Sequence, residues 1–312
     1  MTPQLKRCAA AALGLLLATA AQARTLEVGE TREFKLPSAA AAAAQDGDHV
    51  LIQPGEYFDC AFWKANRLVV EGVGDPEKIV ITDKTCGGKA LFVTVGNDIT
   101  IRNLTLTRAR VPDGNGAGIR GEGRDLVVER VHFINNQNGI LSGTVGGSLT
   151  VRDSVFDRNG VCQGACAHGL YVGRLDLLRV ERTRFTGTKQ GHHIKSRALR
   201  TEVIGCTIQD GPEGTASYMI EVPSGGSLLV RDSTLEKGPK AENHTAAIVI
   251  GSEGVAQPTR EIRIENNTFR NAGDFDTIFV RNLTATEAML RGNRVSGRVR
   301  PLQGDGQVVA AP

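Results

Sequence analysis

A short strand-like phrase recurs along most of the chain. It has the pattern apolar-x-apolar-x-x-small-x-apolar, and neighbouring copies are 23 to 34 residues apart. The eight copies centre on Ile101, Val128, Val151, Val180, Val203, Val230, Ile264 and Leu290. Because the phrase is constant while the spacing varies, we expect fixed strands joined by turns that absorb insertions.

A second series of short strands falls between the copies of the first. Its members centre on Ile119, Ile140, Leu170, Ile194, Ile220, Ile248 and Ile278. Two or more short strands per repeat, with Gly, Asn and Asp turns and no helical period between them, predict an all-β chain folded as a parallel β-helix. We expect about nine coils over residues 24–300, stacked ~4.8 Å apart.

Two other repeat or sheet architectures fit less well. Leucine-rich repeats have a similar period, but their consensus is Leu-rich and fixed in length. An antiparallel jelly roll would not require eight copies of one phrase. Within the phrase, the sixth position changes from Leu104 and Val131 to a run of small polar or cysteine side chains, which predicts a ladder inside the solenoid: Ser154, Thr183, Cys206, Ser233, Asn267 and Asn293.

The ends of an open β-helix present unpaired strand edges and need cover. Residues 38–46 start with Ser38, continue as an alanine run and are followed by Gly47. An N-cap residue, a helix-forming run and a glycine stop predict a short helix that caps the first coil. Beyond Pro301 little can fold, so we expect residues 301–312 to form a C-terminal tail.

The N-terminus has the pattern of a secretory signal peptide over residues 1–23. Lys6 and Arg7 precede an apolar run that ends in Ala-Gln-Ala. We therefore expect a secreted or periplasmic protein, and no other apolar run approaches the length of a membrane-spanning helix. Removal of the signal leaves 35 basic against 34 acidic residues, a net charge of +1, which argues against nucleic acid as a partner.

Five cysteines remain after the signal peptide, and export permits disulfides. We expect Cys60 to pair with Cys86 and Cys162 with Cys166, with Cys206 as a small buried thiol in a strand. The pairing cannot be deduced from sequence alone. A zinc site from Cys162, Cys166 and His168 is an alternative, but no second ligand pair follows.

Three stretches carry a resemblance to a known group of proteins. They are DHVLIQPGEY at residues 48–57, HGLYVG at 168–173 and GHHIKSRA at 191–198. The sequence resembles secreted right-handed parallel β-helix proteins of the pectate-lyase-like superfamily over nearly all of the mature chain. The resemblance implies the handedness of the solenoid and an acidic polysaccharide as the partner. It does not fix the activity, because that superfamily includes lyases, hydrolases and uronate epimerases.

Alternation along the second strand series places the candidate chemistry. If Ile194 points inward, then His193, Lys195 and Arg197 point outward. Stacking the coils puts Tyr171 and Glu221 on either side of Lys195, in a column that reads Arg120, Leu141, Tyr171, Lys195, Glu221, Val249 and Phe279. His168 falls inward or in a bend, and a structural role competes there with substrate binding.

This constellation suits β-elimination from a uronic-acid polymer. Arg197 would neutralise the carboxylate, and Lys195, with its pKa lowered by the adjacent guanidinium, would act as the base. His193 or Tyr171 would protonate the leaving oxygen, and Glu221 and His168 would contact substrate. Related β-helix lyases use Arg or Lys in this way, which makes a polysaccharide lyase the leading interpretation.

The same residues admit other interpretations. Lys195, Arg197 and Glu221 are also what a solvated face of paired charges would contain. A non-catalytic glycan-binding or structural β-helix, and a uronate epimerase, therefore remain alternatives. Calcium assists many related lyases, but no cluster of acidic residues on adjacent coils predicts a calcium or other metal site. We expect a monomer without a cofactor.

Overall fold

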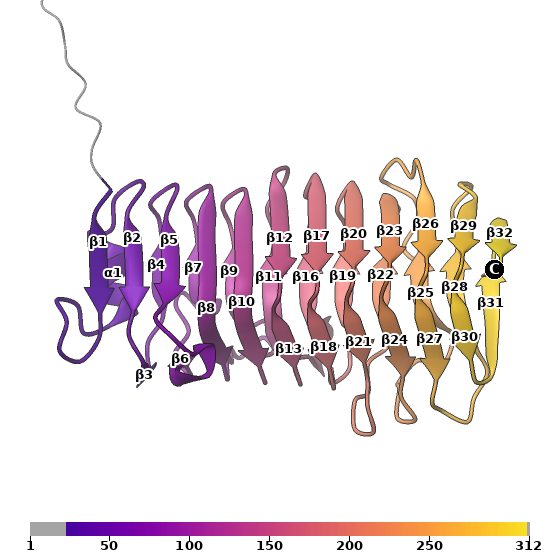
Figure 1. The fold of residues 1–312 in the computed structure, drawn as a ribbon, viewed down its shortest axis with the longest axis horizontal. Helices are drawn as coiled ribbons and strands as arrows, with labels where there is room; N and C mark the ends of the chain where they lie inside the picture. The colour runs from indigo at the N-terminus through magenta and orange to yellow at the C-terminus, as the bar shows by residue number, and fades with distance from the viewer. Residues whose placement is uncertain (1–22, 311–312) are drawn as a thin grey trace, which may run out of the picture.

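The structure, a computed structural model, describes residues 23–310. The predicted signal peptide lies outside the described residues, apart from Ala23. The chain winds into a right-handed parallel β-helix of about 11 coils, slightly more than the nine expected. Figure 1 shows the strands of successive coils side by side along the length of the rod. The predicted fold class is therefore confirmed.

One wall of the solenoid is a parallel sheet to which each of ten coils contributes one strand, called here the ten-stranded sheet. Its strands are β4 (Ala61–Trp63), β7 (Ala90–Thr94), β9 (Ala117–Gly121), β11 (Asn138–Ser142), β16 (Leu170–Val172), β19 (Ile194–Ser196), β22 (Ile220–Val222), β25 (Ala246–Ile250), β28 (Thr277–Asn282) and β31 (Val299–Gln303). This sheet contains the second predicted strand series and positions the candidate site.

The other wall is a bent 20-stranded sheet with two rows. The first row contains β1 (Thr25–Val28), β2 (His49–Ile52), β5 (Val69–Gly72), β12 (Ser148–Arg152), β17 (Leu177–Glu181), β20 (Arg200–Ile204), β23 (Ser227–Arg231), β26 (Ile262–Glu265), β29 (Ala288–Arg291) and β32 (Gly306–Val309). The second row contains β3 (Gly55–Tyr57), β6 (Ile79–Thr82), β13 (Val155–Asp157), β18 (Arg184–Thr186), β21 (Thr207–Gln209), β24 (Thr234–Lys237), β27 (Thr268–Asn271) and β30 (Arg294–Ser296). Strands β8 (Ile99–Thr107) and β10 (Leu126–Ile134) run through both rows.

The eight-residue phrase of the sequence forms two strands in most coils, not one. A residue with positive φ bends the chain between them, for example Asp153 at 51° and Asn266 at 55°. Asn and Asp tolerate this left-handed conformation better than most residues, and glycine adopts it freely, as at Gly205 and Gly292. The bend explains why two unconstrained positions separate the apolar halves of the phrase.

The predicted inward ladder is present immediately after this bend. Ser154, Cys206 and Asn267 are each at most 2% exposed. Side chains of the ladder accept backbone N–H groups from the preceding coil, as Ser233 Oγ does from Cys206 at 3.0 Å and Asn267 Oδ1 does from Ser233 at 2.9 Å. The polar residues therefore satisfy backbone groups at a corner where the sheet ladder is interrupted.

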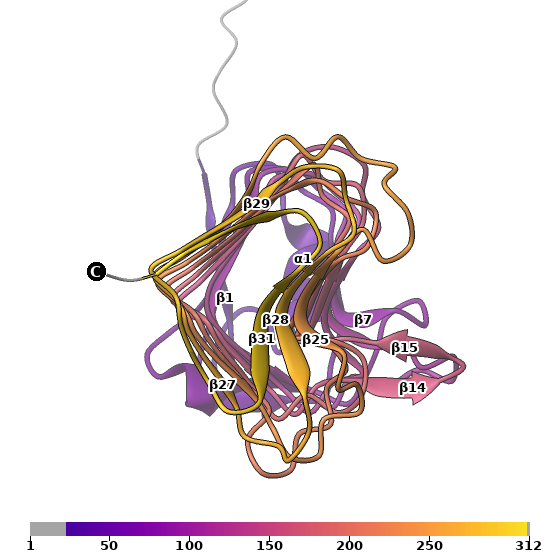
Figure 2. The ribbon, with the colours of Figure 1, turned by 90° about the vertical axis from the view of Figure 1, so that its right-hand side faces the viewer.

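The two ends differ from the expectation in detail. Helix α1 spans Pro37–Ala43 and covers the first coils, as Figure 2 shows for the far end of the solenoid. Its N-cap is Leu36, and the Ser38 N–H bonds to Asp59 Oδ2 at 2.8 Å, so Ser38 is not the cap. At the other end, β31 and β32 complete a final coil, so strand structure extends past residue 300 to Val309 where we expected a tail.

The remaining elements project from or close the coils. A one-turn 3-10 helix, η1, spans Pro76–Lys78. The hairpin β14 (Val161–Gln163) and β15 (Ala165–Ala167) projects from the rod just before β16 (Figure 2). No helix among the described residues is long and apolar enough to cross a membrane.

The cysteines pair as expected. Disulfides join Cys60 to Cys86 and Cys162 to Cys166, and Cys206 is a buried free thiol. Burial raises the pKa of the Cys206 thiol to about 11. The Cys162–Cys166 bond closes the hairpin and leaves no thiolates there for the zinc alternative.

Candidate functional site

The strand register brings most of the predicted column together on the outer face of the ten-stranded sheet. Leu141 pairs with Tyr171, Tyr171 with Lys195, and Lys195 with Glu221. The register differs at the end of the column, where Val249 pairs with Arg281 and not with Phe279. Phe279 is fully buried and stacks on Phe269 in the core.

His193 does not lie on this outer face, contrary to the expectation. Its side chain is 0% exposed and points into the solenoid beside Phe185. Strict alternation fails because His193 precedes β19, where the chain bends into the sheet. Residues at the same place in later coils, Met219 and Ala247, are also fully buried. A catalytic role that requires contact with substrate is therefore wrong for His193.

His193 belongs to a buried polar network. Its Nε2 lies 2.8 Å from Asp210 Oδ1 and its Nδ1 lies 2.8 Å from Thr188 Oγ1. The other Asp210 oxygen accepts the Gly238 N–H at 2.8 Å. Lys237 is fully buried nearby and donates to the Ser217 carbonyl at 2.6 Å. These contacts satisfy polar groups at the corner between the two sheets, so the network is structural.

Lys195 and Arg197 converge with Tyr171, as predicted. Arg197 Nε donates to the Tyr171 hydroxyl at 3.0 Å, and Arg197 Nη1 donates to Ser224 Oγ at 2.7 Å. The Lys195 Nζ and the Arg197 guanidinium lie 5.7 and 5.9 Å from the Tyr171 ring centre. Both distances fall within the range of cation–π attraction. The side chains of Lys195 and Arg197 are 12% and 25% exposed, so the pair remains accessible at the surface.

Glu253, which the sequence did not single out, bridges the two cations. Its Oε1 accepts from Lys195 Nζ at 2.9 Å, and its Oε2 accepts from Arg197 Nη2 at 2.5 Å. Glu253 lies in the loop after β25, two coils beyond β19. The loop folds back because its backbone bonds to Pro223 and Ser224. No short-range pattern signals this contact, which joins residues 56 to 58 positions apart.

The pKa of Lys195 is shifted in the direction opposite to the one predicted from the sequence. Burial alone would lower the pKa of the Lys195 ammonium, but the Glu221 and Glu253 carboxylates outweigh burial and raise it. The expectation that Arg197 lowers this pKa is therefore wrong. The sequence predicted one carboxylate beside Lys195, that of Glu221. The second, that of Glu253, reaches Lys195 only because the loop after β25 folds back.

Glu221 is the buried anion of the site. Its Oε2 lies 3.0 Å from both Lys195 Nζ and His192 Nε2, and its Oε1 accepts from Ser252 Oγ at 2.8 Å. Burial would raise the pKa of the Glu221 carboxyl, but His192, Lys195 and Ser252 outweigh burial and hold the pKa well below its ordinary value. Glu221 is therefore ionised at neutral pH, and its carboxylate holds the Lys195 ammonium in place.

A row of stacked rings borders the cations. His168 stacks on His192 at 4.7 Å, and His192 stacks on Tyr218 at 5.2 Å. His168 Nδ1 accepts the His192 N–H at 2.9 Å, and His192 Nδ1 accepts the Tyr218 N–H at 3.1 Å. A ring nitrogen that accepts a hydrogen bond carries no proton, so each neutral ring carries its proton on Nε2.

Burial is the main reason why the pKa of both histidines is lowered. For His168, the positive charges of Lys195 and Arg197 lower the pKa further. Both rings are therefore neutral hydrogen-bond donors at neutral pH. His168 lies on the outer side beside Tyr171, not inside the solenoid. His192 and Tyr218 were not predicted as site residues, although their positions two residues before the inward Ile194 and Ile220 repeat that of His168 before Leu170.

The donor set does not fit calcium. No group of three or more His, Cys, Asp or Glu side chains within residues 23–310 is arranged to hold a metal ion. The two carboxylates of the site, Glu221 and Glu253, already lie against the Lys195 ammonium. A hard cation that needs six or more oxygen ligands would have to compete with that ammonium for both.

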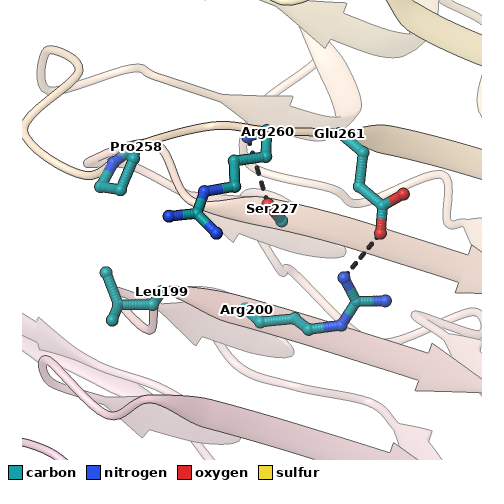
Figure 3. A pocket seen from close by; sticks show the side chains of 6 residues that line it. All are labelled: Leu199, Arg200, Ser227, Pro258, Arg260 and Glu261. Atoms are coloured by element: carbon teal, nitrogen blue, oxygen red, sulfur yellow. Dashed lines mark hydrogen bonds and ion pairs between the residues drawn. The ribbon is translucent and has the colours of Figure 1, made fainter.

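A pocket of about 370 Å³ lies where the loop that carries Glu253 returns to β26, since Pro258, Arg260 and Glu261 line it. Figure 3 shows its lining: Leu199, Arg200, Ser227, Pro258, Arg260 and Glu261. Arg200 Nη1 donates to Glu261 at 2.6 Å, and the Arg260 N–H donates to Ser227 Oγ at 3.2 Å. The pocket lacks the titratable cluster of the outer face, so we place the candidate site at Lys195 and Arg197.

Comparison with known proteins agrees with this fold. No protein family model and no curated protein matches the sequence. Among solved structures, an alginate lyase from Paenibacillus sp. str. FPU-7 superposes with a TM-score of 0.70 at 16% identity, covering 91% of this chain and 99% of that one. The Escherichia coli protein YbhC gives 0.55 at 17% identity, covering 95% and 91%. Pectate lyase Pel9A gives 0.55 at 15% identity, covering 89% and 78%. At these identities the likeness establishes that the chain shares the right-handed parallel β-helix fold.

Proposed function

We propose that this protein is an exported polysaccharide lyase that cleaves a uronic-acid-containing glycan by β-elimination. The single observation that carries the proposal is the accessible Lys195–Arg197 pair packed on Tyr171. It supplies a cation for the carboxylate, a base and a proton donor within one coil step of each other. Two of the similar structures are lyases of alginate and of pectate, which supports the same substrate class. The two disulfides are consistent with an oxidising compartment.

Each side chain has one role in this reaction. The substrate carboxylate displaces Glu253 and binds the Arg197 guanidinium, which acidifies the neighbouring C5 proton. Lys195 Nζ in its neutral form takes that proton, the C4–O bond breaks, and the C4–C5 double bond forms. Because the Glu221 and Glu253 carboxylates raise the pKa of Lys195, this neutral form is populated at alkaline pH, and we expect the activity to rise there. The Tyr171 oxygen accepts from Arg197, so its own hydrogen is free to pass to the departing glycosidic oxygen.

The histidines support binding in this scheme. His168 Nε2–H is not used by the backbone, because the Nδ1 atom takes the His192 N–H. It is available to donate to a substrate hydroxyl or carboxylate oxygen beside Lys195. His192 is a positioning residue, because its Nε2 lies against Glu221 and its Nδ1 is bound to the Tyr218 N–H.

The test is product formation from purified protein. Alginate, pectate and glycosaminoglycans are each incubated with the protein, and the ultraviolet absorbance of the unsaturated uronate is followed. We expect turnover of one class, with loss of at least 100-fold in kcat for Lys195→Met and for Tyr171→Phe, each assayed at a temperature where circular dichroism shows the variant to be folded. Lys240→Met, which removes an exposed lysine elsewhere, is the control. No unsaturated product from any substrate, or full activity of Lys195→Met, contradicts the proposal.

A second candidate is glycan binding without turnover. The observation that favours it is that Lys195 forms ion pairs with both Glu221 and Glu253 in the free protein, so that its ammonium form is stabilised. Binding to a uronic-acid polymer without any unsaturated product would select it. Epimerisation shares the proton abstraction, and incorporation of deuterium at C5 from heavy water without cleavage would identify it.

A further inference from the structure

A side-chain-free strip runs along the outer face from Arg197 toward the N-terminal coils. Gly173 and Gly143 take the place of Arg197 in the two preceding coils, as the backbone bonds from Arg197 N–H to the Val172 carbonyl and from Gly173 N–H to the Ser142 carbonyl show. Tyr171 and Leu141 border this glycine strip on one side, because they pair in the same column as Lys195. The strip therefore presents bare backbone beside Tyr171 and Leu141.

Arg120 closes the far end of the glycine strip. It pairs with Leu141, so it lies three coil steps from Lys195, about 14 Å at the spacing of parallel strands. Its guanidinium extends over Gly143, since a Cβ atom built there would meet Arg120 Nη2 at 3.7 Å and nothing nearer. The Arg120 side chain is 29% exposed.

Among the described residues, the Arg120 guanidinium makes one long ion pair, with a carboxylate that it shares with Lys89. Its Nε is buried without a hydrogen-bond partner among the described residues. The nearest carboxylate, on Glu122, lies 3.9 Å away and is held by Lys89 Nζ at 2.5 Å. A partly exposed guanidinium whose one ion pair is long and shared favours a carboxylate ligand, because its two N–H groups match the two carboxylate oxygens.

We propose that Arg120 is a second carboxylate subsite, which binds another uronate residue of the same polymer, further along the chain than the one held at Arg197. This inference rests on the proposed function and deepens it: the substrate is a polyuronate that lies along the solenoid axis over the glycine strip. Gly143, which lies under the Arg120 guanidinium, is two coil steps from Arg197, about 10 Å, so a single sugar cannot contact both arginines. The subsite therefore contributes to the binding of polymer but not of a single uronate.

On the C-terminal side of Lys195 the outer face of the sheet is covered by the loop after β25. Arg281 lies three coil steps from Lys195 on the other side, and its Nε also lacks a partner among the described residues. However, the loop after β25 covers that side, because Ser252 and Glu253 contact Glu221 and Lys195. The outward Val249 between them is fully buried. Arg281 is thus a matched control for Arg120.

The experiment measures equilibrium binding by calorimetry, in the Lys195→Met background so that no substrate is consumed. The ligands are a long polyuronate and the uronate monosaccharide of the same class. We expect Arg120→Gln to weaken polymer binding about 5- to 30-fold, as loss of a charged hydrogen-bonding partner does, and to leave monosaccharide binding unchanged. Gly143→Val should weaken polymer binding as well, because it obstructs the glycine strip without a backbone clash. Arg281→Gln should match the parent protein.

The outcomes separate this inference from the proposed function. Unchanged polymer affinity in Arg120→Gln, or an equal loss in Arg281→Gln, overturns the subsite even if the wild-type protein is a lyase. Selective loss in Arg120→Gln supports the subsite even if the wild-type protein produces no unsaturated uronate. No binding of any polyuronate overturns both.

Discussion

The Glu253 carboxylate occupies the place that the proposal gives to the substrate carboxylate. It bridges Lys195 and Arg197, and its side chain is 45% exposed on a loop. A substrate must displace it before binding both cations. Glu253→Gln removes the charge while it keeps the size of the side chain, so it tests whether this internal competitor limits binding.

The magnitude follows from the exposure of the pair. Ion pairs with exposed partners contribute about 0.2–1 kcal/mol each, and Glu253 makes two. We therefore expect Glu253→Gln to make the free energy of polymer binding more favourable by about 1 kcal/mol, which lowers KM roughly fivefold. Because Glu253 helps to raise the pKa of Lys195, its loss should also shift the rising limb of the pH–rate profile, along which Lys195 loses its proton, to lower pH.

The assay is the initial rate of unsaturated product as a function of polymer concentration and pH. Glu213→Gln is the control, since Glu213 pairs with Lys240 at an exposed site elsewhere and its substitution makes the same change in net charge. An unchanged or higher KM in Glu253→Gln, with the fold intact, would refute the competition. An unshifted rising limb would refute Lys195 as the base.

Three further predictions concern stability and metals. His193→Ala should lower the free energy of unfolding by about 3 kcal/mol, because it leaves Asp210 buried without its partner; denaturant titration measures this, and lost activity at full stability would instead restore a catalytic role. Burial lowers the pKa of Lys237 from 10.5 to about 8, so the folded protein binds fewer protons than the unfolded chain between these values, and stability should rise by about 3 kcal/mol as pH increases from 8 to 10.5. Lys237→Met should abolish that rise in thermal melts across the same pH range, and an unaltered rise would assign it to another group. Activity should persist after treatment with a calcium chelator and dialysis, since Glu221 and Glu253 are paired with Lys195; restoration by added calcium of an activity lost on chelation would contradict this.

Much of the candidate site follows from the repeat alone. Once Leu170, Ile194 and Ile220 are aligned as inward residues, stacking brings Tyr171, Lys195 and Glu221 into one column. The same rule wrongly placed Phe279 next to Val249 in the outer column. In the structure Ile248 of β25 pairs with Val280 of β28, not with Ile278 as the alignment of the sequence had assumed. The rule works where strands are regular and fails at their ends.

The repeat is enough to predict the coils, their order of stacking and the inward ladder, because these depend on a period-two alternation that recurs in every coil. The inward turn of His193 at a bend and the contact of Glu253 with Lys195 and Arg197 became visible only in the folded chain. A bend breaks the alternation that sequence reasoning uses, and a loop's path depends on backbone bonds to other coils. The protonation state of Lys195 depends on both carboxylates around it, so it too is a property of the folded chain.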